Sequence, residues 1–173
     1  TSCSNLETRK IPLSERKLLF PFGKYKSLVT VFQKDKERDF KAIFQNSLTR
    51  NTFAGVGTLA TSLFKAEEEK VDGKIKVEIY QHSFKNLEAQ IKKSYERLSP
   101  LLSFAVAEIP KGAFKVSKKD SDNFPLEILM ENKEKTKIIF VSYDENKIPK
   151  ELKIETQGFD LKMETLSYTL DGA

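Results

Sequence analysis

The sequence predicts an α+β domain of mainly antiparallel β structure, in which a strongly curved sheet carries a helix over one mouth or face. Three observations predict this class. Apolar and polar residues alternate with a period of two through most of the chain, one stretch after Ser83 changes to a helical period, and alternation then resumes. Strand and helix do not alternate regularly, as a parallel sheet would require.

Length and composition are those of one folded domain. The chain has 173 residues, of which 39% are hydrophobic and 32% charged, with thirteen Phe and five Tyr but no Trp. A chain of this length forms one ordinary domain rather than two. No apolar run of about eighteen residues occurs, so the sequence predicts no membrane-spanning helix.

Positive charge is concentrated in the first part of the sequence. The formal net charge is +5, and residues 1–50 hold 11 Lys and Arg against 5 Asp and Glu. Such an excess attracts nucleic acid or an anionic membrane surface, although a solvated basic face is the simpler interpretation. The basic residues are not interleaved with aromatic ones in an RNA-binding pattern, and one cysteine cannot build a zinc finger. We therefore expect no nucleic-acid partner.

The first half of the chain has the pattern of a linker followed by strands. Residues 4–17 are polar and contain Pro12, which predicts an N-terminal tether at 1–17 and a single folded domain at 18–173. Strands are expected at 28–33 and 40–44, joined across the charged turn 34–38, and at 51–56, 58–66 and 74–79. The segment 58–66 also fits a helix. Together these segments predict five antiparallel strands in series.

One amphipathic helix is expected next. Its apolar residues recur at offsets of three and four and form one stripe: Phe84, Leu87, Ile91, Tyr95 and Leu98. Ser83 is the expected N-cap and Pro100 the expected end. Alternation then predicts strands around Phe114–Val116 and Leu126–Leu129, at 135–143, and at 151–156 and 159–170 around the turn Gln157-Gly158.

The single cysteine has the sequence context of a lipidation site. Thr1-Ser2-Cys3 looks like the end of a bacterial lipobox, in which small residues precede a cysteine whose thiol receives diacylglycerol. A free surface cysteine is the alternative interpretation. No second cysteine exists for a disulfide, and a polar tether follows. In Gram-negative bacteria, Asp directly after the lipidated cysteine favours retention in the inner membrane. Because Ser4 holds this position here, we expect the protein at the outer membrane, with its domain on the periplasmic face.

Residues suited to catalysis or metal binding are few. His82 is the only histidine and has no nucleophile-elbow motif, so it is interpreted as a surface residue. The acidic runs Glu67–Glu69 and Asp120–Asp122 lack the ligand spacing of a calcium loop and are interpreted as solvated loops. We therefore expect no enzymatic activity, no metal and no cofactor.

A glycine motif offers an alternative. Gly55-Val56-Gly57-Thr58-Leu59-Ala60 fits a dinucleotide-binding fingerprint, and Glu78 lies at a distance suited to a ribose contact. The fingerprint requires a strand, a turn and a helix, whereas strands precede it here. The simpler interpretation is that the glycines give a turn or bulge between two strands its backbone freedom.

The same segment carries a family resemblance. Residues 40–44, 51–64, 72–73 and 75–79 resemble the superfamily of outer-membrane lipoprotein carriers and receptors called LolA and LolB, in particular a LolB-like branch of lipoproteins. Ala60 replaces the usual glycine. The segment 148–154, followed by Gly158 and a long last strand, is similar to the closing hairpin of this superfamily. The resemblance covers about residues 25–170.

This resemblance implies an incomplete β-barrel whose apolar concave side, covered by helices, holds acyl chains of lipoproteins or other lipids. It implies a periplasmic carrier protein as a further partner and a cargo-insertion role for Leu59, which otherwise is a core leucine. The residues expected to line the cavity, or equally to fill a core, are Phe40, Phe44, Phe53, Phe64, Ile91, Tyr95 and Phe140. The expected function is binding or transfer of lipoproteins or lipid-like ligands at the outer membrane. The alternative is a structural lipoprotein that serves as a protein-binding scaffold in envelope assembly.

Overall fold

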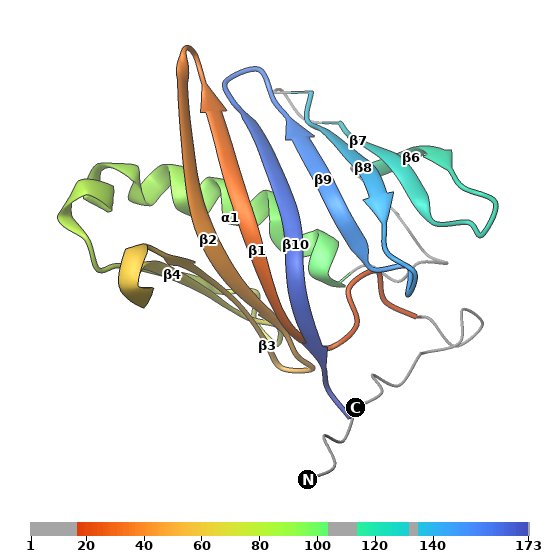
Figure 1. The fold of residues 1–173 in the computed structure, drawn as a ribbon, viewed down its shortest axis with the longest axis horizontal. Coiled ribbons are helices and arrows are strands. Elements are labelled where there is room, and N and C mark those ends of the chain that lie inside the picture. Colours follow the sequence, from red (N-terminus) through yellow and green to blue (C-terminus); the bar gives the residue numbers. More distant parts are fainter. Residues whose placement is uncertain (1–16, 104–113, 132–134, 173) are drawn as a thin grey trace, which may run out of the picture.

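The computed structural model describes residues 17–103, 114–131 and 135–172 (Figure 1). Within them, ten strands form one antiparallel sheet. Their bounds are β1 Gly23–Gln33, β2 Lys36–Asn46, β3 Arg50–Val56, β4 Ser62–Glu69, β5 Ile75–Ile79, β6 Phe114–Lys119, β7 Pro125–Met130, β8 Lys137–Tyr143, β9 Pro149–Glu155 and β10 Asp160–Leu170.

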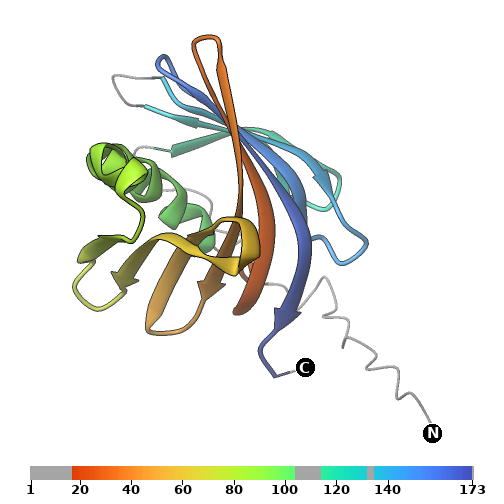
Figure 2. The same cartoon turned by 60° about the vertical axis from the view of Figure 1, so that its left-hand side comes forward.

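The strand order explains how the sheet is built from two runs of hairpins. The order is β5-β4-β3-β2-β1-β10-β9-β8-β7-β6, so every neighbouring pair is consecutive in sequence except β1 with β10. The first and last strands therefore join the two halves, and β5 and β6 form open edges. The sheet is strongly curved and not closed (Figure 2). The predicted fold class, an incomplete barrel of antiparallel strands with a helix over it, is confirmed.

Strand alternation places the apolar side chains on the concave face. In β2, Phe40, Ala42 and Phe44 share one face, and they pair with Val29, Ser27 and Tyr25 of β1. The same face continues through β10 and β9, where Leu161 pairs with Ile154 and Met163 with Leu152. Most of these side chains are buried. The predicted hairpin of the first two strands is correct, but the strands are longer and the turn is reduced to Lys34 and Asp35.

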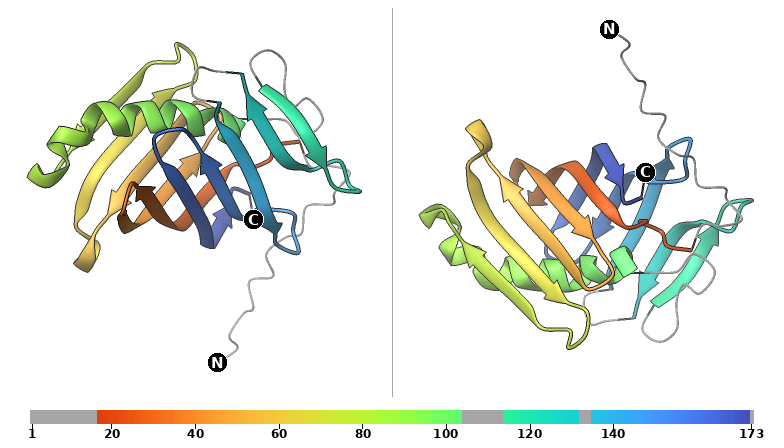
Figure 3. Two further views of the ribbon diagram at one scale, coloured as in Figure 1. Left: turned by 90° about the horizontal axis from the view of Figure 1, so that it is seen from above. Right: turned by 90° about the horizontal axis from the view of Figure 1, so that it is seen from below.

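The helical segment crosses the concave face. A 3-10 helix, η3 (His82–Leu87), leads into α1 (Glu88–Ser103), which packs against β3, β4 and β5 (Figure 3). The predicted cap at Ser83 is wrong, since the N-cap is Gln81 without a side-chain hydrogen bond. The predicted end at Pro100 is also wrong. Proline fixes φ near −65°, a helical value, so it removes one hydrogen bond without ending the helix. None of the described helices has the length and apolar character needed to cross a membrane.

Aromatic rings fill the end of the sheet where β1 begins and β2 ends. Phe20, just before β1, is fully buried and meets Tyr25 and Phe44 edge-on, with ring centroids 5.5 and 5.4 Å away. The rings of Tyr25 and Phe44 stack at 4.7 Å. The segment before β1 thus closes this end of the curved sheet.

A buried amide ties three elements together at the same end. Nδ2 of Asn46 donates to the carbonyl oxygens of Phe20, at 2.7 Å, and of Leu102 at the end of α1. Its Oδ1 accepts from Nζ of Lys70 at 2.9 Å. Because all these polar atoms are satisfied, the junction of sheet, helix and N-terminal segment is specific as well as buried.

Candidate functional site

A cavity of about 660 Å³ lies between the concave face and the helical segment. This volume is within the range usual for ligand sites. Its lining comes from β1, the following turn, β2, β3, β4, η3, α1 and the start of β10. The lining residues are Val31, Gln33, Asp35, Lys36, Glu37, Arg38, Phe40, Phe53, Phe64, Phe84, Leu87, Ile91, Ser94, Tyr95, Phe159 and Leu161.

The walls are mainly aromatic. Phe64 is the central ring, with Phe40, Phe53 and Phe84 at centroid distances of 5.7, 6.0 and 6.1 Å. Tyr95 of α1 continues the series at 6.2 Å from Phe53. Rings from three strands and two helices therefore enclose one apolar space, which is suited to an alkyl chain or another apolar group.

The structure separates the seven expected cavity residues into two groups. Five of them line this cavity: Phe40, Phe53, Phe64, Ile91 and Tyr95. Phe44 instead belongs to the aromatic cluster with Phe20 and Tyr25. Phe140 of β8 is buried and stacks on Tyr143 at 5.8 Å. Both have the same strand alternation as the lining residues, but other rings cover them.

The rim of the cavity is charged. Lys36 and Arg38 share the concave face of β2 with Phe40, so this face passes from cations at the hairpin end to aromatic rings further in. The Arg38 guanidinium lies over the Phe84 ring, 5.1 Å from its centroid. This cation–π contact joins the β1–β2 hairpin to η3 across the rim.

A polar spot lies where α1 meets the sheet. The Tyr95 hydroxyl and Oε2 of Glu68 are buried without a hydrogen-bond partner in the described part of the chain. Burial raises the pKa of Tyr95, and the negative charge of Glu68 raises it further. Tyr95 is therefore a protonated hydrogen-bond donor throughout the physiological range.

Leu59 occupies the tip of the turn between β3 and β4. Its side chain is 98% exposed, so the interpretation as a core leucine is wrong. Thr58–Ala60 form the single 3-10 turn η2, in which Leu59 and Ala60 both have φ of 57°. This left-handed conformation favours glycine. Alanine at position 60 therefore makes the turn more strained than glycine would.

Comparison with known proteins gives structural matches only. No family model matches the chain, and no curated protein matches its sequence. A LolA superfamily protein from Nitrosomonas europaea matches at a TM-score of 0.58 and 7% identity, covering 93% of this chain and 91% of that one. The chain has a LolA-like fold.

Two further structures are similar over most of their length. A domain named for outer membrane lipoprotein sorting, from Vibrio parahaemolyticus, has a TM-score of 0.46 and 8% identity, with 93% of this chain and 90% of that chain covered. A DUF1329 family protein from Desulfovibrio piger has a TM-score of 0.43 and 7% identity, with 89% and 87% covered.

In this LolA-like fold the glycine fingerprint is not followed by the α-helix that a dinucleotide-binding motif requires. β4 begins at Ser62, directly after η2, so the motif lies in a β-turn-β unit and the dinucleotide interpretation is wrong. Gly55 has a packing role instead, because a Cβ there would lie 2.4 Å from the Phe64 ring. Glu78 lies on the edge strand β5, where it accepts a hydrogen bond from the Tyr80 hydroxyl at 2.6 Å and pairs with Lys76.

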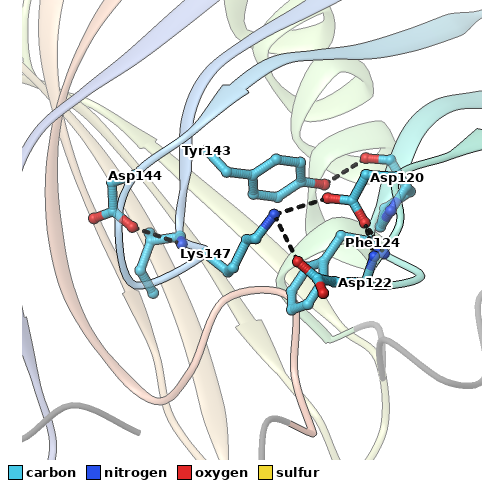
Figure 4. Close-up of polar contacts among 8 residues, drawn as sticks. Asp120, Asp122, Phe124, Tyr143, Asp144 and Lys147 are labelled. Atoms are coloured by element: carbon cyan, nitrogen blue, oxygen red, sulfur yellow. Dashed lines mark hydrogen bonds and ion pairs between the residues drawn. The ribbon is translucent and has the colours of Figure 1, made fainter. Parts of the chain in front are cut away.

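A lysine bridges the two carboxylates of the acidic turn Asp120–Asp122. Nζ of Lys147 lies 3.0 Å from Oδ2 of Asp120 and 3.2 Å from Oδ2 of Asp122 (Figure 4). It also lies over the rings of Phe124 and Tyr143. The ammonium group thus lies between the two carboxylates. No group of three or more metal-ligating side chains is found among the described residues.

This contact joins two hairpin loops of matching design. In Asp120–Phe124 and in Asp144–Ile148, Oδ1 of the first residue accepts from the backbone N–H groups two and four positions later, at 2.8 to 2.9 Å. Asn123 and Lys147 hold the same place in each loop, with φ of 64° and 56°. A proline then starts β7 and β9. The pattern Asp-x-x-x-apolar-Pro-x-Glu therefore occurs twice in the sequence, at 120–127 and 144–151, and this repeat is a signal from which the two matching loops can be predicted.

Other site residues were missed for different reasons. Phe84 and Leu87 belong to the predicted helical stripe, so its continuation toward Ile91 was a usable signal. The charged rim gave no such signal, because charged turn residues are ordinary. His82 is exposed at the start of η3. Cys3 lies outside the described residues.

Proposed function

We propose that this protein binds or transfers lipoproteins or lipid-like ligands at the outer membrane, anchored through a lipidated Cys3 and facing the periplasm. The observation that carries the proposal is the cavity, which has aromatic walls and a charged rim. Binding of this kind requires no catalytic residue. The lining combines apolar side chains with hydrogen-bonding and charged groups at its edges.

The energetics favour an acyl chain as the occupant. Each methylene removed from water contributes about 0.8 kcal/mol. A chain that extends past Phe40, Phe64 and Phe53 would bury several such groups, while a polar head stays at the rim near Lys36 and Arg38. The cavity thus suits an amphiphile of one or two chains, in agreement with the LolA-like fold.

Leu59 is the proposed cargo-insertion residue. It is nearly fully exposed on a three-residue turn. A leucine presented in this way enters the interfacial region of a bilayer at little structural cost, because it leaves no packing behind. A scaffold function would instead be favoured by a filled core and an extended apolar patch.

The test is native mass spectrometry of the protein extracted from its own membrane, followed by denaturing mass analysis. We expect a lipid mass on Cys3 and a second, separable lipid or acyl-peptide in the cavity. The variant Ser94→Phe fills the cavity from α1 and should lose the separable ligand. Glu96→Phe, on the exposed side of the same helix, is its control.

The outcomes separate the alternatives. A lipidated Cys3 with an empty domain in the unsubstituted protein would favour the scaffold. An unmodified Cys3 in the native host would remove the outer-membrane placement. Retention of the ligand by Ser94→Phe would exclude this cavity as its site.

A further inference from the structure

Two exposed apolar side chains lie on neighbouring turns at the end of the sheet opposite the cavity rim. Leu48, in the turn between β2 and β3, is 76% exposed, and Val71, between β4 and β5, is 93% exposed. Exposed leucine or valine is common when scattered, but these two occupy the tips of adjacent turns. We name them the paired tips.

Lys70 holds the two turns together. Its backbone N–H donates to the carbonyl oxygen of Thr49 at 3.0 Å, and its Nζ donates to the carbonyl oxygen of Ser47. Nζ also lies 5.0 Å from the centroid of the Phe22 ring. One residue therefore fixes both turns against each other and against the chain that enters β1. The paired tips are presented as a rigid unit.

The N-terminal segment joins the sheet at this same end. Gly23, the first residue of β1, pairs with Asn46 at the end of β2 and with Leu170 at the end of β10. Figure 1 shows the start of β1, the turn after β2 and the end of β10 together. The described residues that lead into β1, 17–24, contain Lys17 and Lys24 and no Asp or Glu. Apolar tips and a basic entry to β1 thus lie at one end of the sheet.

We propose that the paired tips rest on a phospholipid bilayer that contains anionic headgroups. Apolar side chains at the interface, combined with nearby Lys and Arg, are the two features by which a peripheral surface binds such a membrane. The proposal concerns a surface that neither the cavity nor Leu59 includes, and the binding itself is independent of the lipid on Cys3.

Membrane contact through the paired tips would also orient the cavity, and the meaning of this orientation rests on the proposed function. The rim residues Lys36 and Arg38 lie at the start of β2, and Leu48 follows its end, so an 11-residue strand of about 35 Å separates them. With the paired tips on the bilayer, the rim faces the aqueous phase, where it can receive cargo. Leu59 lies at the other end of β3 from Leu48, so bilayer contact through Leu59 is a second orientation.

The chain contains no tryptophan, which allows a direct test. Single-tryptophan variants Leu48→Trp, Val71→Trp, Leu59→Trp and Leu166→Trp are prepared in the full chain carrying Cys3→Ser, so that no lipid anchor contributes. Each is mixed with vesicles of phosphatidylethanolamine and phosphatidylglycerol, with and without brominated acyl chains. Leu166 is 52% exposed on β10 and serves as the control position.

We expect a blue shift and bromine quenching for Leu48→Trp and Val71→Trp, and neither for Leu166→Trp. Flotation of the double variant Leu48→Ser/Val71→Ser should show at least a tenfold weaker partition into the vesicles, while Val141→Ser/Leu166→Ser should bind like the parent. Pure phosphatidylcholine vesicles should bind less protein.

Several results would overturn the proposal. Quenching confined to Leu59→Trp would place the membrane contact at the opposite end of β3. Equal vesicle binding by the parent and by Leu48→Ser/Val71→Ser would exclude the paired tips. A dimer in sedimentation that this double variant dissociates would show that the tips bind a second copy instead. Loss of ligand in the mass measurement above leaves these results unchanged, so the two proposals fail separately.

Discussion

Gly55 and Phe64 face each other across β3 and β4, and the ring of Phe64 lies where a side chain at position 55 would be. A Cβ on Gly55 would lie 2.4 Å from the nearest ring carbon. Phe64 is also the ring around which the cavity wall is assembled. The absence of a side chain at Gly55 therefore sets the position of the central lining residue.

We expect Gly55→Ala to push the Phe64 ring toward the cavity and to narrow it. Overpacking of this kind costs roughly 1–3 kcal/mol. Urea unfolding measures the cost, and native mass spectrometry measures ligand occupancy in the same sample. The control is Gly158→Ala, because nothing lies within 4 Å of a Cβ there. Unchanged stability and occupancy in Gly55→Ala would show that Phe64 has room elsewhere.

Among the polar residues, Asn46 should be the one whose replacement lowers the free energy of unfolding most. Asn46→Ala leaves the carbonyl oxygens of Phe20 and Leu102 and the ammonium of Lys70 without this partner. Burial already lowers the pKa of Lys70, with Glu68 opposing the shift. We expect a loss of about 3 kcal/mol in the free energy of unfolding. The exposed Asn86→Ala is the control, and a loss no larger than the control's would contradict the junction described above.

The left-handed turn at the tip of β3 and β4 offers a stabilising substitution. A left-handed φ costs a residue with a side chain roughly 1–2 kcal/mol, and glycine avoids most of this cost. Ala60→Gly should therefore raise the unfolding free energy by up to about 1 kcal/mol after its own entropy cost. Ala54→Gly, within β3, should lower it. Chemical denaturation measures the change in unfolding free energy for both variants, which should be opposite in sign. Destabilisation by Ala60→Gly would mean that the turn is not left-handed.

The fold was largely predictable because strand alternation is a local signal. Phe40 and Phe44 were assigned to one face of one strand from sequence, and the structure places them there. Their different surroundings were not predictable. Phe20 covers Phe44 from a segment more than twenty residues away. Phe40 instead meets Phe64 edge-on and lines the cavity. Whether a strand residue joins the core or lines the cavity therefore depends on contacts from distant segments.

Helix ends and turns were less predictable, because each prediction depended on a single residue, such as Ser83 or Pro100, whose effect the surrounding structure can override. Pro100 was expected to end the helix, but its fixed φ is helical. The segment 58–66 fitted helix and strand equally. The structure divides it between η2 and β4, because two left-handed residues reverse the chain before the strand begins.

The contact between Asp120 and Lys147 should make stability depend on acid pH. Burial alone would raise the pKa of Asp120, but hydrogen bonds from Lys147 and from the backbone N–H groups of Phe124 and Asp122 outweigh it. The pKa of Asp120 in the folded protein therefore lies below its ordinary value of 3.8. The same contact raises the pKa of Lys147.

A lowered carboxyl pKa in the folded state stabilises the protein at pH values above 3.8, and this contribution is lost as the pH falls through the folded-state pKa. Asp120→Asn should cost about 1 kcal/mol at pH 7, a value typical of a partly exposed ion pair. It should also flatten the fall of unfolding free energy below about pH 4. Urea unfolding between pH 2.5 and 7, with Asp35→Asn as control, measures both effects. A parallel fall in the parent and in Asp120→Asn would assign the acid sensitivity to other carboxylates and leave Lys147 as a packing residue.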